Sequence, residues 1–253
     1  MRIEIIKCLK DNFSYLIIDE QNNSACVIDP SEASPIIDHV EKLKLNLKFI
    51  LNTHHHFDHI GGNKELKKKY NLKVIGFEKD KERIPEIDIK LKDKEIWKSN
   101  KFETKIYHIP GHTSGHICYH FFNQNILFTG DTLFSLGCGR IFEGTYEQMF
   151  SSLQLIKSFP GNTKIYCGHE YTKKNSDFCL SIDSKNSKLI NKISNINKNI
   201  QNGNPTIPSI LRDELECNIF LRSDNIEIQK QLGVNRGNPI EAFAKLRDLK
   251  DNF

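Results

Sequence analysis

No apolar run in the 253-residue sequence approaches the roughly 18 residues that a membrane-spanning helix needs. The first residues, Met-Arg-Ile-Glu-Ile-Ile-Lys, alternate like a strand and lack the apolar segment of a secretion signal. A concentrated basic patch for nucleic acid is missing too, and the formal net charge is only +4. We therefore expect a cytoplasmic protein with neither a membrane nor a nucleic acid as partner. The small positive charge favours an anionic substrate.

The sequence also lacks any Cys-x-x-Cys pair. Its seven cysteines are odd in number, and several have small apolar neighbours. We interpret them as reduced, mostly buried thiols, not as a disulfide frame. No internal repeat or low-complexity tail is present, so the length fits one large domain or two smaller ones.

Strand-like runs rich in isoleucine alternate with helical patterns in the first two thirds of the chain. We predict strands at 3–8, 15–18, 25–28, 48–51, 73–77, 105–109, 117–122, 126–128 and 164–167, and helices at 36–45, 63–70 and 146–157. From about residue 171, strand-like runs end and Asn/Lys-rich helical stretches follow, broken by a loop at 202–205. The pattern predicts an α/β domain over residues 1–170 and a helical domain over residues 171–253.

The run Thr53-His54-His55-His56-Phe57-Asp58-His59 follows one of the predicted strands. His54 and His56 can converge on one cation, and Asp58 and His59 can then turn toward a second. Imidazole and carboxylate ligands suit zinc, iron or manganese, and favour Zn²⁺ most simply. The internal position, the embedded aspartate and the following Gly61-Gly62 argue against a surface histidine tract.

Three further candidate ligands each follow a glycine at the end of a predicted strand, namely His112, Asp131 and His169. A lone histidine or aspartate at such a place is more often structural than a ligand. However, nine of the ten histidines lie between residues 54 and 169. Together with the histidine-rich run, these strand ends predict a metal centre.

These motifs resemble the metallo-β-lactamase superfamily. Within it, THHHFDHIGGN, PGHTSGHICY, FTGDTLFSLGCGR, FEGT and CGHEYT resemble glyoxalase II, the hydroxyacylglutathione hydrolase family. The resemblance continues to the end of the chain through Arg247-x-x-Lys250-Asp251-x-Phe253. It implies an αβ/βα sandwich of two mixed sheets flanked by helices, followed by a helical, substrate-binding domain. We expect a monomer.

The resemblance also implies a site with two divalent metal ions. One ion would be held by His54, His56 and His112, and the other by Asp58, His59 and His169, with Asp131 bridging both. A hydroxide shared by the ions, oriented by Asp58, would be the nucleophile. His55 is expected to point away, and His108 and His120 have no expected role. Asp29 and His116 are candidates to orient ligand imidazoles, although a structural role suits each equally well.

The activity that the resemblance implies is hydrolysis of S-D-lactoylglutathione, and of related S-2-hydroxyacylglutathiones, to D-lactate and glutathione. This is the second step of methylglyoxal detoxification. The implied substrate-binding residues are Arg140, Tyr171, Arg247 and Lys250. Phe142 stands where some relatives have tyrosine, which removes one possible hydroxyl contact to the tripeptide. Gly144-Thr145 is interpreted as a turn and helix cap.

The final helical pattern bears on two of these residues. Its apolar arc contains Ile240, Phe243, Leu246 and Phe253, and Arg247 and Lys250 fall within or beside that arc. Two interpretations fit this geometry equally well. Either the cations serve to bind substrate, or their side chains extend along the core only so that the charged ends reach water. The resemblance favours substrate binding.

The nearest alternative is a persulfide dioxygenase of the same superfamily with a single iron. The complete second set of ligands and the tail with Arg247 and Lys250 argue against it. Lactonase, β-lactamase and nuclease are other hydrolases of the same scaffold. A non-enzymatic metal-binding protein would be expected to lose ligands, and all seven are present.

Overall fold

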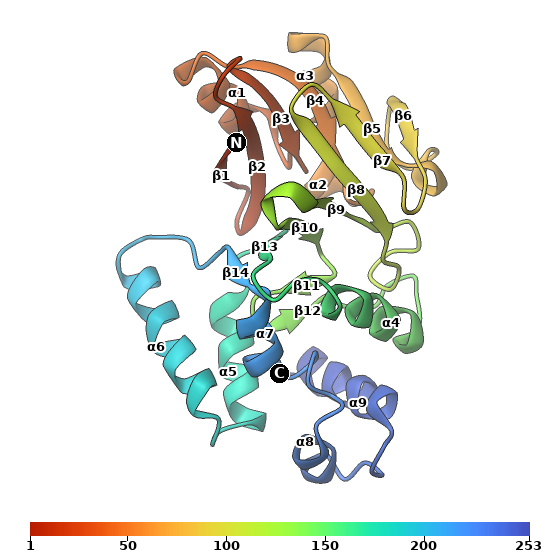
Figure 1. Cartoon of the computed structure of the whole chain (residues 1–253), viewed down its shortest axis with the longest axis vertical. Coiled ribbons are helices and arrows are strands. Elements are labelled where there is room, and N and C mark those ends of the chain that lie inside the picture. Colours follow the sequence, from red (N-terminus) through yellow and green to blue (C-terminus); the bar gives the residue numbers. More distant parts are fainter. The chain divides into compact units, whose positions relative to one another are not determined.

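The computed structural model describes all 253 residues, and they form two compact units (Figure 1). The first unit comprises Met1–His108 and Gly115–Gln124. The second unit comprises Ile109–Ser114 and Asn125–Phe253. Candidate ligands occur in both units.

A six-stranded mixed sheet forms the centre of the first unit. Its strands, in sheet order, are β1 (Arg2–Cys8), β2 (Asn12–Asp19), β3 (Ser24–Ile28), β4 (Asn46–Leu51), β5 (Lys73–Phe77) and β6 (Ile87–Leu91). The first three are antiparallel, and β3 to β6 run parallel. Every residue of β2 and β3 is buried, as expected for strands that are covered on both faces.

Each face of this sheet is covered by a different layer. Helices α1 (Ala33–Lys42) and α3 (Asn63–Tyr70) place Ile36 and Leu66 in one core with sheet residues such as Val27. The second layer is an antiparallel ladder of β7 (Ile96–Ser99), β8 (Phe102–His108) and β9 (Ile117–Phe121). Phe49 of β4 meets Trp97 of β7 edge-on at 5.0 Å between ring centroids. Short helical turns lie at α2 (Phe57–Ile60), η1 (Glu78–Asp80) and η2 (Phe122–Gln124).

The second unit combines three short strands, a hairpin and six helices. Strand β10 (Ile126–Gly130) is parallel to β13 (Lys164–Cys167), which pairs antiparallel with β14 (Ser209–Ile210). Strands β11 (Leu133–Phe134) and β12 (Gly137–Cys138) form the hairpin. The helices are α4 (Tyr146–Lys157), α5 (Thr172–Ile182), α6 (Ser187–Gln201), α7 (Leu211–Cys217), α8 (Ile226–Gln231) and α9 (Pro239–Asp251). The rings of Phe178, Phe220 and Phe243 are packed among these helices.

Most predicted elements are present. Strand β5, helix α4 and strand β13 have the predicted bounds, and chain 202–205 lies in the loop after α6. The helix predicted at 36–45 is α1, which begins and ends three residues earlier. Strands β6, β7, β11 and β12 were not predicted. The expectation that no strand follows residue 171 is wrong, because the two-residue strand β14 pairs with β13.

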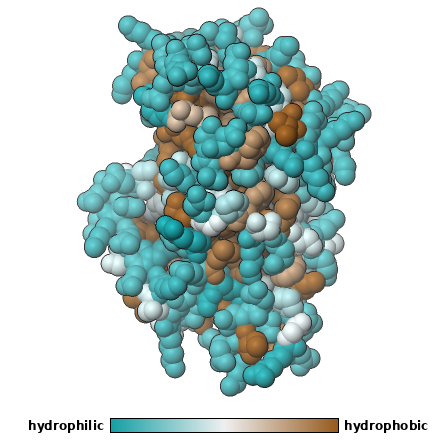
Figure 2. Space-filling model, viewed as in Figure 1, coloured by the Kyte–Doolittle hydropathy of each residue, from teal (hydrophilic) through white to brown (hydrophobic).

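Hydrophilic residues cover most of the surface visible in Figure 2, and hydrophobic side chains form smaller areas. All seven cysteines are buried and free, which confirms the interpretation of reduced thiols. Burial raises the pKa of Cys167 and of Cys179 to about 12, so both are neutral thiols near neutral pH. None of the helices has the combination of length and hydrophobicity that a membrane crossing requires.

The cap predicted at Thr145 is a complete capping box at the start of α4. Thr145 Oγ1 accepts from the Gln148 N–H, and Gln148 Oε1 accepts from the Thr145 N–H at 3.1 Å. Replacing Thr145 by alanine should lower the free energy of unfolding by about 1 kcal/mol in urea denaturation, because a helix donor loses its acceptor. Thr145→Ser keeps the hydroxyl and should stay near wild type. Equal losses in both variants would show that the hydroxyl does not stabilise the helix.

Candidate functional site

The histidine loop, residues 53–59, leaves the end of β4 and gathers imidazoles around His54. The ring centroid of His54 lies 4.7 Å from that of His56 and 4.2 Å from that of His59. His116, directly before β9, stacks on His54 with 4.6 Å between ring centroids and an interplanar angle of 19°. His54, His59 and His116 are all fully buried. The loop therefore brings together the side chains that were predicted to bind metal in the first unit.

Asp29 fixes this loop from the neighbouring strand end. Its carboxylate accepts from the Thr53 N–H at 2.7 Å and from Thr53 Oγ1 at 2.6 Å, and it lies 3.1 Å from His59 Nδ1. Because an ionised carboxylate only accepts, Nδ1 of His59 carries the hydrogen and Nε2 presents its lone pair. Asp29 adopts φ of 46°, a conformation that non-glycine residues rarely adopt outside tightly constrained sites.

Asn12 holds Asp58 at the other end of the loop. Its amide Nδ2 donates to the backbone oxygen of Asp58 at 3.0 Å and to Oδ2 at 2.9 Å. Oδ2 of Asp58 lies 3.7 Å from Nε2 of His59. Sequence reasoning missed Asn12, since it stands 46 residues away and nothing around it marks a functional residue.

Three further histidines of the first unit have other surroundings. His55 faces Asp80, with 3.4 Å between Nδ1 and Oδ2, and Asp80 is buried and paired with Arg83. His108 stacks on Phe77 at 4.7 Å. Burial, and then the nearby Lys105, lower the pKa of His120. These positions agree with the expectation that all three stay out of the ligand set.

The carboxylate cluster, His112, Asp131 and His169, lies in the second unit. The strand ends that carry Asp131 and His169 are joined by a hydrogen bond from the Gly168 N–H to the Gly130 oxygen at 2.9 Å. Oδ2 of Asp131 is 3.5 Å from His112 Nε2 and 3.2 Å from His169 Nε2. All three side chains are largely buried, so two imidazoles converge on one carboxylate oxygen with little water around them.

The chemistry of this cluster fits a bound cation. His112 Nδ1 lies 2.8 Å from the backbone oxygen of Arg140, and a carbonyl can only accept. The ring hydrogen is therefore on Nδ1, and in a neutral ring the lone pair of Nε2 faces the Asp131 carboxylate. Two electron-rich atoms at 3.5 Å repel each other unless a cation lies between them. Imidazole and carboxylate are ligands of Zn²⁺ and other divalent transition metals.

Two of the candidate substrate-binding residues, Tyr171 and Arg140, contact this cluster within the second unit. Tyr171 stacks on His169 with 4.7 Å between ring centroids and an angle of 3°. Arg140 is exposed, and its Nε lies 3.3 Å from Asp251 Oδ1. Phe142 is 61% exposed and meets His112 edge-on at 5.1 Å. An apolar ring thus lies beside a candidate metal ligand. A tyrosine at this position would place its hydroxyl in solvent.

The two cations of α9 differ in exposure. Arg247 is only 4% exposed, and its guanidinium donates to the Cys138 oxygen at 2.7 Å and to Asp251 Oδ1 at 2.9 Å. Lys250 is half-buried against the rings of Phe178 and Phe253 and donates to the Lys174 oxygen at 3.0 Å. Burial, and then Arg247, lower the pKa of Lys250. Arg247 lies on the packing face, as predicted, whereas Phe253 lies beyond the helix and is exposed.

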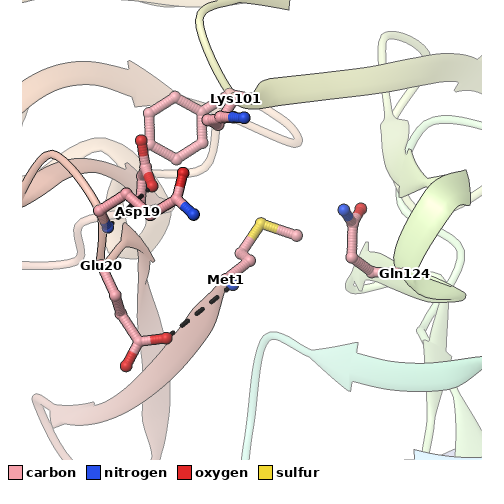
Figure 3. A pocket seen from close by; sticks show the side chains of 7 residues that line it. Met1, Asp19, Glu20, Lys101 and Gln124 are labelled. Carbon is pink, nitrogen blue, oxygen red and sulfur yellow. Dashed lines mark hydrogen bonds and ion pairs between the residues drawn. The ribbon is translucent and has the colours of Figure 1, made fainter.

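A pocket of about 320 Å³ opens near the amino terminus in the first unit (Figure 3). It is lined by Met1, Asp19, Glu20, Gln21, Lys101, Phe102 and Gln124. The amino group of Met1 pairs with Glu20 at 3.9 Å. The lining contains no histidine or cysteine.

Two family models match the chain. Residues 10–169 match the model described as "Metallo-beta-lactamase superfamily", and residues 170–253 match "Hydroxyacylglutathione hydrolase C-terminus". A protein of Pelagibacter ubique named hydroxyacylglutathione hydrolase is 58% identical, with 100% of both chains covered. A protein of the same name from Rhodospirillum rubrum is 41% identical over 99% of this chain and 98% of its own. The crystal structure of ETHE1 from Myxococcus xanthus has the same fold, with a TM-score of 0.64, 22% identity, and 99% and 100% of the two chains covered.

Replacing Asp29 by asparagine should weaken metal retention about 10- to 100-fold, because one of its acceptor positions becomes a donor beside Thr53 and His59. The measurement is the metal content after equilibration with a competing chelator. Asp19→Asn is the control, since Asp19 is a buried aspartate at the end of β2 that accepts only from the nearby Gln21 and Asn22. If both variants retain metal like the wild type, Asp29 does not orient a ligand.

Proposed function

Because the chain belongs to the hydroxyacylglutathione hydrolase family of the metallo-β-lactamase superfamily, we propose that it hydrolyses S-D-lactoylglutathione and related S-2-hydroxyacylglutathiones to a 2-hydroxy acid and glutathione. Its α/β architecture with mixed sheets is the metallo-β-lactamase fold. The observation that carries the proposal is the similarity to named relatives along the whole chain, including the helical part after residue 169.

We assign the seven candidate ligands to the two sets that the family resemblance implies. In this proposal His54, His56 and His112 hold one divalent ion, Asp58, His59 and His169 hold a second, and Asp131 contributes to both. The fixed tautomers of His59 and His112 support these roles, because both rings present Nε2 as a ligand atom. We take zinc as the metal, with iron and manganese as alternatives that the same ligands accept.

Two divalent ions, when bound, polarise a carbonyl group and lower the pKa of a water molecule toward neutrality. The chain's own contribution is orientation. Asp58, which Asn12 fixes, accepts a hydrogen bond from the attacking water and directs it at the thioester carbonyl. The water oxygen bonds to the carbonyl carbon while its protons pass to solvent, the C–S bond breaks, and the products are the 2-hydroxy acid as a carboxylate and glutathione as a thiolate. A free thiol has a pKa of about 8.5, so no strong general acid is needed. The buried cysteines stay protonated and take no part.

The substrate's glutathione part carries two carboxylates, and cations of the second unit suit them. We propose that Arg140 and Lys250 bind the tripeptide directly and that Tyr171 contacts it from its position on His169. Arg247 remains a proposed substrate-binding residue. Its buried donors to Cys138 and Asp251 favour a contribution through the neighbouring Arg140, which pairs with the same carboxylate.

The proposal also includes the domain division, the cellular location and the oligomeric state. The division into domains at residue 170 is supported by the separate family models for 10–169 and 170–253. A cytoplasmic location is supported by the seven free, buried thiols. A monomer is expected, because no partner is required to complete the proposed set of ligands.

The central test is the loss of S-D-lactoylglutathione in the presence of the purified, metal-loaded protein, with glutathione release measured in parallel. Replacing Asp131 by alanine should abolish turnover and remove both ions together, as measured by metal analysis, since one carboxylate serves both. Asp177→Ala, at an exposed position of α5, is the control. Two ions per chain and full turnover in the Asp131 variant would rule out the shared ligand.

Replacing Lys250 by alanine should raise KM for glutathione thioesters about tenfold or more, the effect of losing one charge-assisted hydrogen bond of about 1.5–3 kcal/mol. KM for a small uncharged thioester should change little. Lys245→Ala is the matched control, because Lys245 lies on the same helix and is exposed on its solvent face. Equal effects of the Lys250 variant on both substrates would show that Lys250 does not bind the tripeptide.

A further inference from the structure

Five consecutive backbone oxygens in the β11–β12 hairpin, residues 134–138, accept hydrogen bonds from side chains of the following helical part. Asn218 donates to Phe134 and Gly137 at 3.3 and 3.1 Å, Asn175 to Ser135 at 3.1 Å, Cys179 to Leu136 at 3.1 Å, and Arg247 to Cys138 at 2.7 Å. The two strands of the hairpin are paired at only two residue positions. Its shape is therefore determined mainly by donors from residues 175–247.

Glu214 of α7 stands at the centre of this arrangement and has no role in the proposed reaction. It is fully buried. Its Oε2 accepts from the Leu136 N–H at 2.7 Å and from Asn218 Nδ2 at 3.1 Å. Its Oε1 accepts from Ser135 and Ser209 and lies 2.9 Å from Lys192 Nζ. A buried carboxylate with this many donors stays ionised and fixes each of them in direction.

Charge balance keeps Glu214 in that state. Burial by itself acts to raise the pKa of Glu214, but Lys192 and the hydrogen-bond donors outweigh it, and the pKa is lowered. Glu214 in turn raises the pKa of Lys192 against the effect of burial. The pair is thus a compensated ion pair inside the second unit, and removing one partner leaves a buried charge.

The hairpin turn needs such support because Leu136 has an unfavourable backbone conformation. Its φ is 57°, in the left-handed region that residues other than glycine, asparagine and aspartate rarely adopt. Its side chain is fully buried, its N–H donates to Glu214, and its oxygen accepts from Cys179. Such a conformation persists only where several neighbours impose it.

The chain that leaves this hairpin reaches the carboxylate cluster within two residues. Gly139 lies so close to Asp131 that a Cβ at this position would meet the backbone oxygen of Asp131 at 1.9 Å. The next residue, Arg140, supplies the carbonyl that fixes the His112 ring, and its side chain is a candidate substrate cation. A shift of the hairpin therefore moves a metal ligand and a substrate-binding group together.

We propose that Glu214 is a positioning residue, which fixes the Ser135–Arg140 segment so that the Arg140 carbonyl orients His112 and the Arg140 side chain faces the substrate. The part that concerns substrate rests on the proposed function, whereas the part that concerns His112 rests only on the cluster's geometry. The helical part after residue 169 then shapes the metal centre as well as binding substrate.

Glu214→Gln is the test, because it keeps the side-chain shape and replaces one acceptor by a donor, which then faces either Lys192 or the Leu136 N–H. We expect metal retention against a competing chelator to fall about tenfold or more and KM for S-D-lactoylglutathione to rise by a similar factor. Asp183→Asn is the matched control, since it breaks the part-buried Asp183–Arg222 pair of the same helical part without contacting residues 134–140. It should lower Tm but leave metal retention and KM unchanged.

If Glu214→Gln does not fold, Asn175→Ala removes a single donor to the Ser135 oxygen and should change both quantities in the same direction by a smaller factor. The proposal is overturned if Glu214→Gln lowers Tm as Asp183→Asn does but leaves metal retention and KM at wild-type values. Metal retention is measured without substrate. If the wild-type protein does not hydrolyse lactoylglutathione, the proposed function is contradicted. The metal-retention measurement still decides whether Glu214 positions His112, because it does not depend on that activity.

Discussion

The hydrogen bond from His112 Nδ1 to the backbone oxygen of Arg140 is the interaction on which the second unit's part of the site depends. It determines which nitrogen of the ring carries the hydrogen, and so which nitrogen faces Asp131. A backbone oxygen cannot rotate to find a substitute partner, so the ring is only as well placed as the chain around Arg140. Asp29 does the same for His59 in the first unit, with a carboxylate in place of the carbonyl.

Backbone strain accompanies both of these orienting groups. Asp29 and Leu136 each have positive φ, and each makes several hydrogen bonds to groups far away in sequence. The cost of a left-handed non-glycine residue is on the order of 1–2 kcal/mol, comparable to one or two hydrogen bonds, so such residues need their neighbours. Asp29 contacts the His59 ring directly, whereas Leu136 lies four residues before Arg140, whose carbonyl contacts His112.

The sequence indicates the candidate ligands but not most of the groups that hold them in place. His54, His112 and Asp131 are recognisable because each stands beside glycine or other histidines at the end of an apolar strand. Strands β5 and β13 were predicted correctly for the same reason, since a compact apolar run with polar flanks has few other interpretations. Helix α1 was placed three residues late because its apolar pattern starts at Ile36, whereas the helix itself begins at Ala33 and includes Pro35 in its first turn, where proline is tolerated. Strands β11 and β12 have two residues each, too few for any periodicity.

Glu214, Asn175 and Asn218 show why the rest could not be predicted. An asparagine or glutamate in an Asn/Lys-rich helical stretch is most simply a solvated residue, and only the tertiary contacts reveal that these three are buried. Arg247 did give a signal, because a cation on an apolar helix face must find partners. Its partners are a backbone oxygen of the hairpin and the aspartate that also pairs with Arg140. The hairpin's backbone oxygens need donors that its two strand pairs cannot supply, so the helical part is a structural requirement of the carboxylate cluster.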